Sequence, residues 1–329
     1  MMQKPTVLNR AILAAVAGVV AMVAGAGGAT AAPMTTTEIL DQFNLVVFGD
    51  LSGTSEVEGR SLIGGNLTGG SMTFNTRAAP ISTFDELIVG GNVSGGGFKN
   101  LNNGGDATVG GNVQNMNLNG NGTLNLGGAV TGTVHAGTVN ANQAVTIPDF
   151  QAALQKTSAD LAGLAGVAPG LSGNRGLFNT AIPDGNDLAV YNVDTSFFDA
   201  INEIELGLNG ATTVVINVTG TGALTISDNF LGGPFALADN ILWNFSDVTS
   251  LTFGTQFFGS VLAPNAAVTN TSPIEGSLIA DSLVLNGEVH QQPFAGDLPT
   301  TRVLGPGTLV LFGGGLLALG AVGRRRHGR

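Results

Sequence analysis

Cysteine is absent from this chain of 329 residues. Its absence excludes a disulfide framework, a zinc site or iron–sulfur cluster held by thiolates, and a cysteine nucleophile. Histidine is nearly as scarce, with three residues, one of them in the basic C-terminal tail. The side chains that most often carry catalysis are therefore few. We predict that the protein is not an enzyme and that it needs no cofactor.

Charged residues are also few, at 11% of the chain, and the two signs are unevenly placed. Six of the twelve Lys and Arg residues lie in the first ten and the last six positions, whereas all 23 Asp and Glu residues lie between them. The body is therefore strongly acidic and repels the phosphate backbone of nucleic acids. We predict no nucleic-acid partner.

Glycine, in contrast, is abundant, with 51 residues, and it recurs in a Gly-Gly-Asn motif. The motif stands at 64–66, 90–92 and 110–112, and a degenerate copy stands at 127–129. Short runs of alternating apolar and polar residues separate these motifs, and Gly and Asn supply the positive φ angles that tight corners need. The repeat predicts a mainly β fold, a right-handed parallel β-solenoid whose coils bury their apolar sides by stacking.

The repeated Asn66, Asn92 and Asn112 have two interpretations. They either stack as a ladder along one corner or only serve the geometry of each turn. A second β region, from about 188 to 294, contains the repeat Gly-Ser-Val-Leu-Ala and Gly-Ser-Leu-Ile-Ala at 259–263 and 276–280.

Two helices flank these β regions. Thr35 and Glu38 form a capping box, which predicts a short amphipathic helix over 34–44. Pro148 begins a second helix, predicted over 148–166, whose apolar stripe packs along the solenoid. The stripe consists of Phe150, Leu154, Leu161 and Leu164.

The first 31 residues have the pattern of a secretory signal peptide. Lys4 and Arg10 precede the apolar run from Ala11 to Ala24, and Ala29-Thr30-Ala31 fits an A-x-A cleavage site. This predicts export through the general secretory route; the alternative is an uncleaved membrane anchor.

The C-terminus, residues 303–329, has a second targeting pattern. Gly307 to Gly323 carries no charge and is followed by Arg324, Arg325 and Arg326, as expected for a transmembrane helix with a cytoplasmic flank. The segment resembles a PEP-CTERM sorting signal, matching its motif at Val303, Pro306, Thr308 and Leu309, whereas Leu304 and Gly305 replace the first Pro and the Glu.

The PEP-CTERM resemblance implies a sorting transpeptidase of the exosortase type as a partner. It also implies membrane anchoring through the C-terminal helix, followed by release to the cell surface or matrix of a Gram-negative-type bacterium. A plain tail anchor is the alternative.

The body between these signals, residues 32–302, resembles the choice-of-anchor A family over about 37–295. The matching features are the strand-like run at 44–50, the Gly-Gly-Asn repeats, Trp243-Asn244-Phe245, the stretch at 259–266 and the closing Gly-Glu-Val-His at 287–290. The resemblance implies an adhesive, surface-exposed protein, and it brings no catalytic residues. The C-terminal coils are also similar to the β-solenoid of bacterial ice-binding proteins.

Three sets of polar residues are candidates for chemistry. Glu288 and His290 lie two positions apart on one strand face, where we expect them to cap the last coil rather than to catalyse. Asp184, Asn186 and Asp187 are weak candidates for a calcium site, with an ordinary Asx turn as the alternative. Threonine pairs such as Thr219 and Thr221 are spaced too irregularly to predict a regular outward row.

The sequence thus predicts an exported, surface-anchored, non-enzymatic protein. It would act through a repetitive polar β surface in adhesion or in an extracellular matrix, with exopolysaccharide or other surface components as partners. Two alternatives stay open: an enzyme acting on polysaccharide on a β-helix scaffold, and an ice-binding-like protein.

Overall fold

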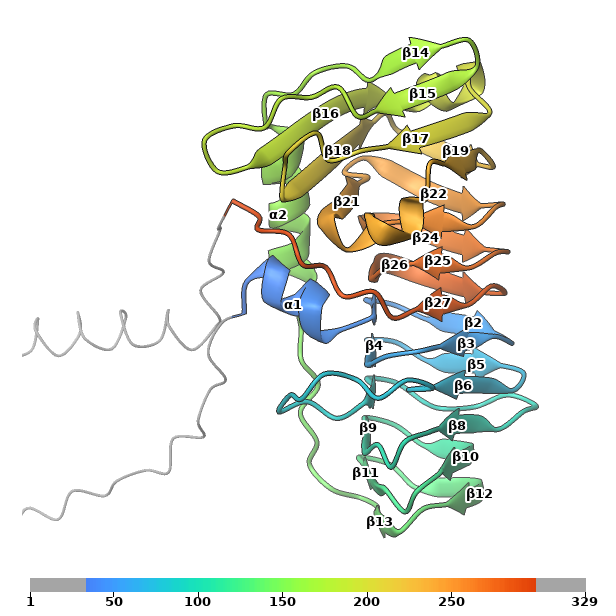
Figure 1. Cartoon of the computed structure of the whole chain (residues 1–329). Coiled ribbons are helices and arrows are strands. Elements are labelled where there is room, and N and C mark those ends of the chain that lie inside the picture. The colour runs from blue at the N-terminus through green and yellow to red at the C-terminus, as the bar shows by residue number, and fades with distance from the viewer. Residues whose placement is uncertain (1–33, 300–329) are drawn as a thin grey trace, which may run out of the picture. The chain divides into compact units, whose positions relative to one another are not determined.

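The computed structural model describes residues 34–299. In it, very short strands stack from coil to coil and form a parallel β-solenoid (Figure 1). The fold class predicted from the repeats is confirmed. The predicted signal peptide and the sorting signal with its transmembrane helix lie outside the described residues. Within 34–299, no helix has the length and apolar character needed to cross a membrane.

The elements of the N-terminal half are α1 (Thr36–Gln42), β1 (Leu45–Val47), β2 (Leu51–Gly53), β3 (Glu56–Val57), β4 (Ser61–Ile63), β5 (Leu67–Gly69), β6 (Met72–Phe74), β7 (Leu87–Val89), β8 (Lys99–Leu101), β9 (Ala107–Val109), β10 (Val113–Leu118), β11 (Thr123–Leu126), β12 (Val130–His135) and β13 (Thr138–Asn140).

The C-terminal half comprises α2 (Gln151–Ala162), β14 (Gly170–Ser172), β15 (Arg175–Phe178), β16 (Leu188–Asp194), η1 (Thr195–Ala200), β17 (Glu203–Leu206), β18 (Thr213–Thr219), β19 (Gly222–Ile226), β20 (Asn229–Leu231), η2 (Pro234–Ala236), η3 (Ala238–Asn240), β21 (Ile241–Asn244), β22 (Val248–Phe253), β23 (Phe257–Phe258), β24 (Ser260–Asn270), β25 (Ile274–Glu275), β26 (Leu278–Leu285) and β27 (Val289–His290).

The coils have three faces. Face A has the strand order β13-β11-β9-β7-β4-β1-β26-β24-β21-β18-β16. Face B contains β5 and β2, the second halves of β26 and β24, and then β22 and β19. Face C has the order β12-β10-β8-β6-β3-β27-β25-β23, and a separate sheet orders β14-β15-β17-β20. Alternate residues of each strand point into the core, where Leu45, Ile63 and Trp243 are fully buried.

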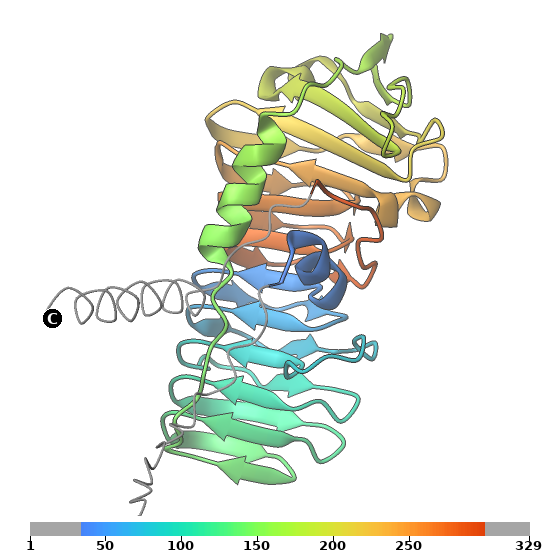
Figure 2. The same cartoon turned by 90° about the vertical axis from the view of Figure 1, so that its left-hand side faces the viewer.

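The order of the coils does not follow the order of the chain. The chain begins in the middle of the stack at β1 and winds to β13 at one end (Figure 1). It then returns along the stack through α2, and β16 to β27 wind back from the opposite end (Figure 2). The two halves meet at a seam where β1 and β2 pair with β26, and β3 pairs with β27. The prediction that Glu288 and His290 cap a last coil is wrong, because β27 lies inside the stack.

Both predicted helices exist and pack on face A. The capping box of Thr35 and Glu38 forms at the start of α1, as predicted. Helix α2 is shorter than the predicted 148–166 at both ends. It begins at Gln151, whose N–H donates to the Asp149 carboxylate, and it ends at Ala162 with Gly163 as its C-cap. Leu154 and Leu161 of the predicted stripe are buried in a cluster with outward residues of face A.

A buried asparagine ladder also attaches α2 to face A. Asn192, Asn217 and Asn244 stand on neighbouring strands, and each donates a side-chain hydrogen bond to a backbone carbonyl of 158–164. Asn244 also donates to Asn217, and Asn217 donates to Asn192. This part of face A is therefore committed to packing against α2, whereas faces B and C carry no such helix among the described residues.

Candidate functional site

Face B presents one outward row of small polar side chains along the stack, which we call the outer row. Strand register places Thr225 beside Thr252, Thr252 beside Thr269, and Ser52 beside Thr68. Val284 joins the two halves of the row across the seam. In spatial order the row is Thr225, Thr252, Thr269, Val284, Ser52, Thr68, Ser94, Gln114 and Thr131.

A second outward row lies beside the first. In the C-terminal half it consists of small residues, Ala223, Ser250, Ala267 and Ser282. In the N-terminal half it is the asparagine ladder: the side-chain oxygen of Asn66 accepts the Asn92 N–H at 2.9 Å, and that of Asn92 accepts the Asn112 N–H at 2.8 Å. Asp50 begins the ladder and accepts the Asn66 N–H at 2.6 Å. Of the two interpretations of these asparagines, the ladder is confirmed.

The two rows form a regular, nearly uncharged surface. Neighbouring strands of a sheet are about 4.8 Å apart, so the rows present one polar group at about that interval. The Thr68 hydroxyl donates to the Leu51 carbonyl of the next coil at 3.4 Å, and the Thr131 hydroxyl donates to the Val113 carbonyl at 3.3 Å. These bonds orient the hydroxyls and leave their oxygens able to accept bonds from an outside partner.

The expectation that threonines form no regular outward row is wrong. Loops of different length separate the coils, so Thr225 and Thr252 are 27 positions apart in the chain, whereas Thr269 and Val284 are only 15 positions apart. Register in space is set by the buried residues on either side of the row, such as Leu251 and Phe253, and not by spacing along the chain. The detectable signal was the alternation within each strand, as in the Leu-Thr-Phe of 251–253.

Glu288 and His290 do contact each other, and a residue from another coil completes the group. The His290 Nε2 lies 2.6 Å from a Glu288 carboxylate oxygen, and its Nδ1 lies 2.6 Å from Glu275. Glu275 is 2% exposed and stands beside His290 in the register of β25 and β27. Burial lowers the pKa of His290, but the hydrogen bonds to Glu288 and Glu275 outweigh it and the pKa is raised. Both ring nitrogens are engaged, which suits a structural link more than a free catalytic base.

The Asp184 loop has the geometry of an Asx turn. The Asp184 carboxylate accepts the N–H groups of Asn186 at 2.8 Å and Leu188 at 3.1 Å, and these bonds lower its pKa. Asp187 follows with φ of 58°. Residues 34–299 contain no group of three or more His, Asp or Glu side chains placed to hold a metal ion. Calcium binding at Asp184, Asn186 and Asp187 stays a prediction.

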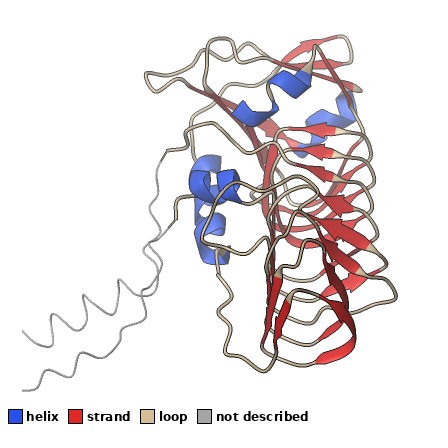
Figure 3. Ribbon diagram, turned by 60° about the horizontal axis from the view of Figure 1, so that its bottom comes forward, coloured by secondary structure: helices blue, strands red, loops and turns tan. Residues whose placement is uncertain are grey.

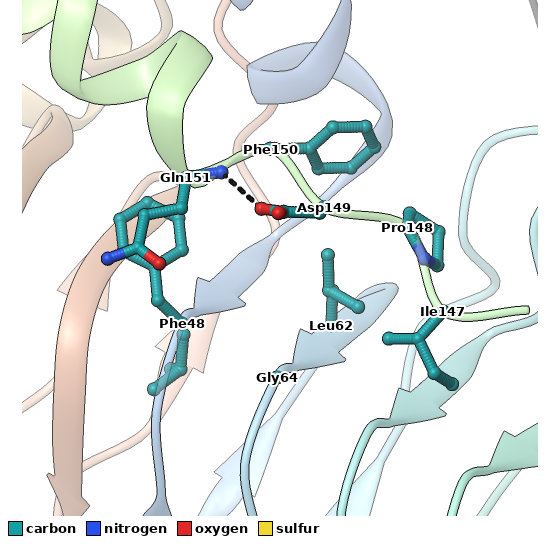
Figure 4. A pocket seen from close by; sticks show the side chains of 9 residues that line it. Phe48, Leu62, Gly64, Ile147, Pro148, Asp149, Phe150 and Gln151 are labelled. Atoms are coloured by element: carbon teal, nitrogen blue, oxygen red, sulfur yellow. Dashed lines mark hydrogen bonds between the residues drawn. The ribbon is translucent and has the colours of Figure 1, made fainter. Parts of the chain in front are cut away.

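A pocket of about 300 Å³ lies between face A and the extended segment before α2 (Figure 4). Phe48, Leu62 and Ile147 line its apolar part, and Asp149 is the one acidic residue in its lining. Hydrolysis of a glycosidic bond ordinarily requires two carboxyl groups across the bond. The pocket therefore lacks the pair that a polysaccharide-cleaving site would need.

A family model described as "Putative Ice-binding-like adhesive domain" matches residues 36–291. No curated protein matches the chain. Among solved structures, the chain is similar to an ice binding protein from an Antarctic bacterium, Flavobacteriaceae, at 18% identity and a TM-score of 0.29. That similarity covers 78% of this chain and 82% of the other.

Proposed function

This chain belongs to the family of ice-binding-like adhesive domains, and from that membership we propose that it is an adhesive surface protein whose contact surface is face B. The observation that carries the assignment to face B is the outer row, which runs through both halves of the solenoid. Face A from β7 to β16 packs in the cluster that contains α1 and α2, so that part is not available for such a contact.

The chemistry of face B favours an extended, uncharged, hydroxyl-rich partner. A polysaccharide offers hydroxyl groups at regular intervals and meets several threonines and serines of the outer row together. Each such hydrogen bond is worth only about 1 kcal/mol, because both groups leave water to form it. Affinity therefore comes from the number of coils engaged and from the number of anchored copies. Exopolysaccharide is the ligand that we propose.

We propose further that the protein is exported and held at the cell surface through its two ends. This part of the proposal depends on the signal-peptide pattern of 1–31 and on the sorting pattern of 303–329. Deletion of 303–329 should move the protein from the membrane fraction to the medium. Unchanged retention in the membrane fraction would exclude the C-terminal anchor.

A non-enzymatic mechanism is part of the proposal. Glu275 and Glu288 converge on one point and are both bound to His290. Glu203 and Glu205 also converge, and both form ion pairs with Arg175. Asp149 has no second acid across the pocket that it lines. Incubation with exopolysaccharide should therefore release no shorter glycans, and their release would favour the enzyme instead.

The test of face B compares binding of the full chain and of two variants to exopolysaccharide from the producing cells. The variant T225V/T252V/T269V removes three hydroxyls of the outer row while keeping side-chain shape. The control T73V/T212V makes the same change at residues outside the outer row. We expect the triple variant to bind about tenfold more weakly or worse, and the control to bind like the parent. Equal binding by all three proteins would reject face B.

Ice is the second candidate ligand, because the family description and the flat outer row both suit it. Thermal hysteresis of the same proteins separates the two ligands. Activity in the parent that falls in T225V/T252V/T269V would assign ice to face B. Absence of activity would exclude ice and leave the polysaccharide.

A further inference from the structure

One end of the described solenoid is open. Its last coil consists of β12 and β13, which are terminal strands of faces C and A (Figure 3). Within residues 34–299, β12 pairs with β10 on one side and β13 pairs with β11 on one side. The other edge of each strand presents backbone N–H and C=O groups that no described strand satisfies.

The hydrophobic core also reaches solvent at this end. Three valines of the last coil point inward. Each stacks on a fully buried side chain of the coil above, in the pairs Val130 on Val113, Val134 on Met116 and Val139 on Leu124. Val130 is 38% exposed and Val139 is 41% exposed. Solenoids normally close such an end with a polar capping element, because the terminal coil cannot bury its own apolar side.

The opposite end is built differently, because an antiparallel strand lies over it. There β14 pairs antiparallel with β15, and Val167 forms a bridge with Tyr191 of β16. Tyr191 is buried and its hydroxyl accepts the N–H groups of Thr180 and Ala181. The two ends therefore differ: β12 and β13 end parallel sheets at one of them, whereas the antiparallel strand β14 lies at the other.

The open end also lacks the charges that normally keep strand edges apart. Residues 130–147 contain no Lys, Arg, Asp or Glu, although the body as a whole is strongly acidic. Natural proteins usually protect exposed edges with charged residues or proline. Here two acidic copies can approach without like charges meeting, whereas a basic or acidic partner finds no opposite charge to pair with.

We propose that the open end is an interface between two copies of this chain. The two copies meet about a two-fold axis, with β12 and β13 of one copy beside the same coil of the other. Strands related in this way run antiparallel, so their free N–H and C=O groups satisfy each other, and the exposed valines of both copies become buried. The contact is self-complementary about the two-fold axis, so this interface closes at two copies.

The absence of cysteine allows a direct test on the full chain. Single cysteines are introduced at exposed positions of the open end, as T131C, T133C and T138C, and at an exposed corner of the other half, as T221C. Under mild oxidation we expect a disulfide-linked dimer for at least one of the first three and none for T221C. Light scattering on the unmodified chain should report twice the monomer mass across the same concentrations.

The double variant T133K/T138K tests the same interface without a crosslink. It places positive charges of both copies opposite each other, and we expect association to weaken by about tenfold or more. The control T221K should associate like the parent, and circular dichroism confirms that both variants fold. A monomeric parent would overturn the proposal. So would a dimer that T133K/T138K leaves intact or that crosslinks only through T221C.

Discussion

The seam between the two halves depends on one buried asparagine. Asn44 is 4% exposed, and its side-chain oxygen accepts the Gly59 N–H of the N-terminal half at 2.9 Å. Its amide nitrogen donates to the carbonyls of Gly276 at 3.1 Å and His290 at 3.0 Å in the C-terminal half. The substitution Asn44→Ala removes all three bonds and leaves three backbone groups without this partner.

The expected loss follows from the cost of those unsatisfied groups. A buried backbone donor or acceptor left without a hydrogen bond costs about 1–3 kcal/mol. Three such groups, with partial relief by entering water, give a loss of about 3–6 kcal/mol in the free energy of unfolding. A typical domain is stable by only about 5–15 kcal/mol, so the expected loss is a large part of the total.

Urea denaturation followed by two signals measures this loss. Trp243 is the one tryptophan and lies buried in the C-terminal half, so its fluorescence reports that half, whereas circular dichroism reports the whole β structure. Asn229 is exposed on β20, and Asn229→Ala is the matched control with an expected change within about 0.5 kcal/mol. A loss in Asn44→Ala no larger than in Asn229→Ala would refute the role of Asn44 at the seam.

Three further predictions concern the same body. Gly53→Ala places a Cβ against the Leu285 carbonyl oxygen across the seam and should destabilise the fold by about 1–3 kcal/mol. The control Gly96→Ala, whose Cβ would have nothing within 4 Å, should leave the stability unchanged, and thermal denaturation compares the two variants. Burial raises the pKa of Asp228 to about 6, so the stability that its neutral carboxyl contributes is present below the ordinary value of 3.8 and is lost as pH rises through about 6. The variant Asp228→Asn, which cannot ionise, should therefore be more stable than the parent at pH 8 by about 1–2 kcal/mol. Equal melting temperatures of the two proteins at pH 8 would contradict this. The pKa of His290 is raised, so the stability that its protonated ring contributes is fully present below the ordinary value of 6.5 and is lost as pH rises through the folded value. The variant His290→Gln should therefore lower the melting temperature at pH 5.5 more than at pH 9. An equal decrease at both pH values would show that protonation of His290 does not stabilise the fold.

Much of the fold was predictable because its signals are local. The capping box of Thr35 and Glu38 and the apolar positions Leu154 and Leu161 each depend on residues a few positions apart. The Gly-Gly-Asn corners are different, because their residues do not have the positive φ angles that the sequence predicted. A Cβ at Gly90 would instead meet the Gly64 carbonyl of the neighbouring coil. The contact of Glu288 with His290 was predictable, since alternate residues of a strand share a face. Glu275, the third member of that group, was not predictable, because it reaches His290 only through the pairing of β25 with β27.

The sequence by itself determined that short strands with Gly and Asn corners stack into a solenoid, because each coil has its own alternation and its own turns. Only the tertiary structure decided which coils are neighbours. The order β4-β1-β26-β24 joins Val46 to Ile279, which are far apart in the chain, and no local pattern encodes that pairing. The outer row and the open end follow from the same non-local stacking: buried side chains align Thr252 with Thr269, and the return of the chain through α2 leaves β12 and β13 at one end.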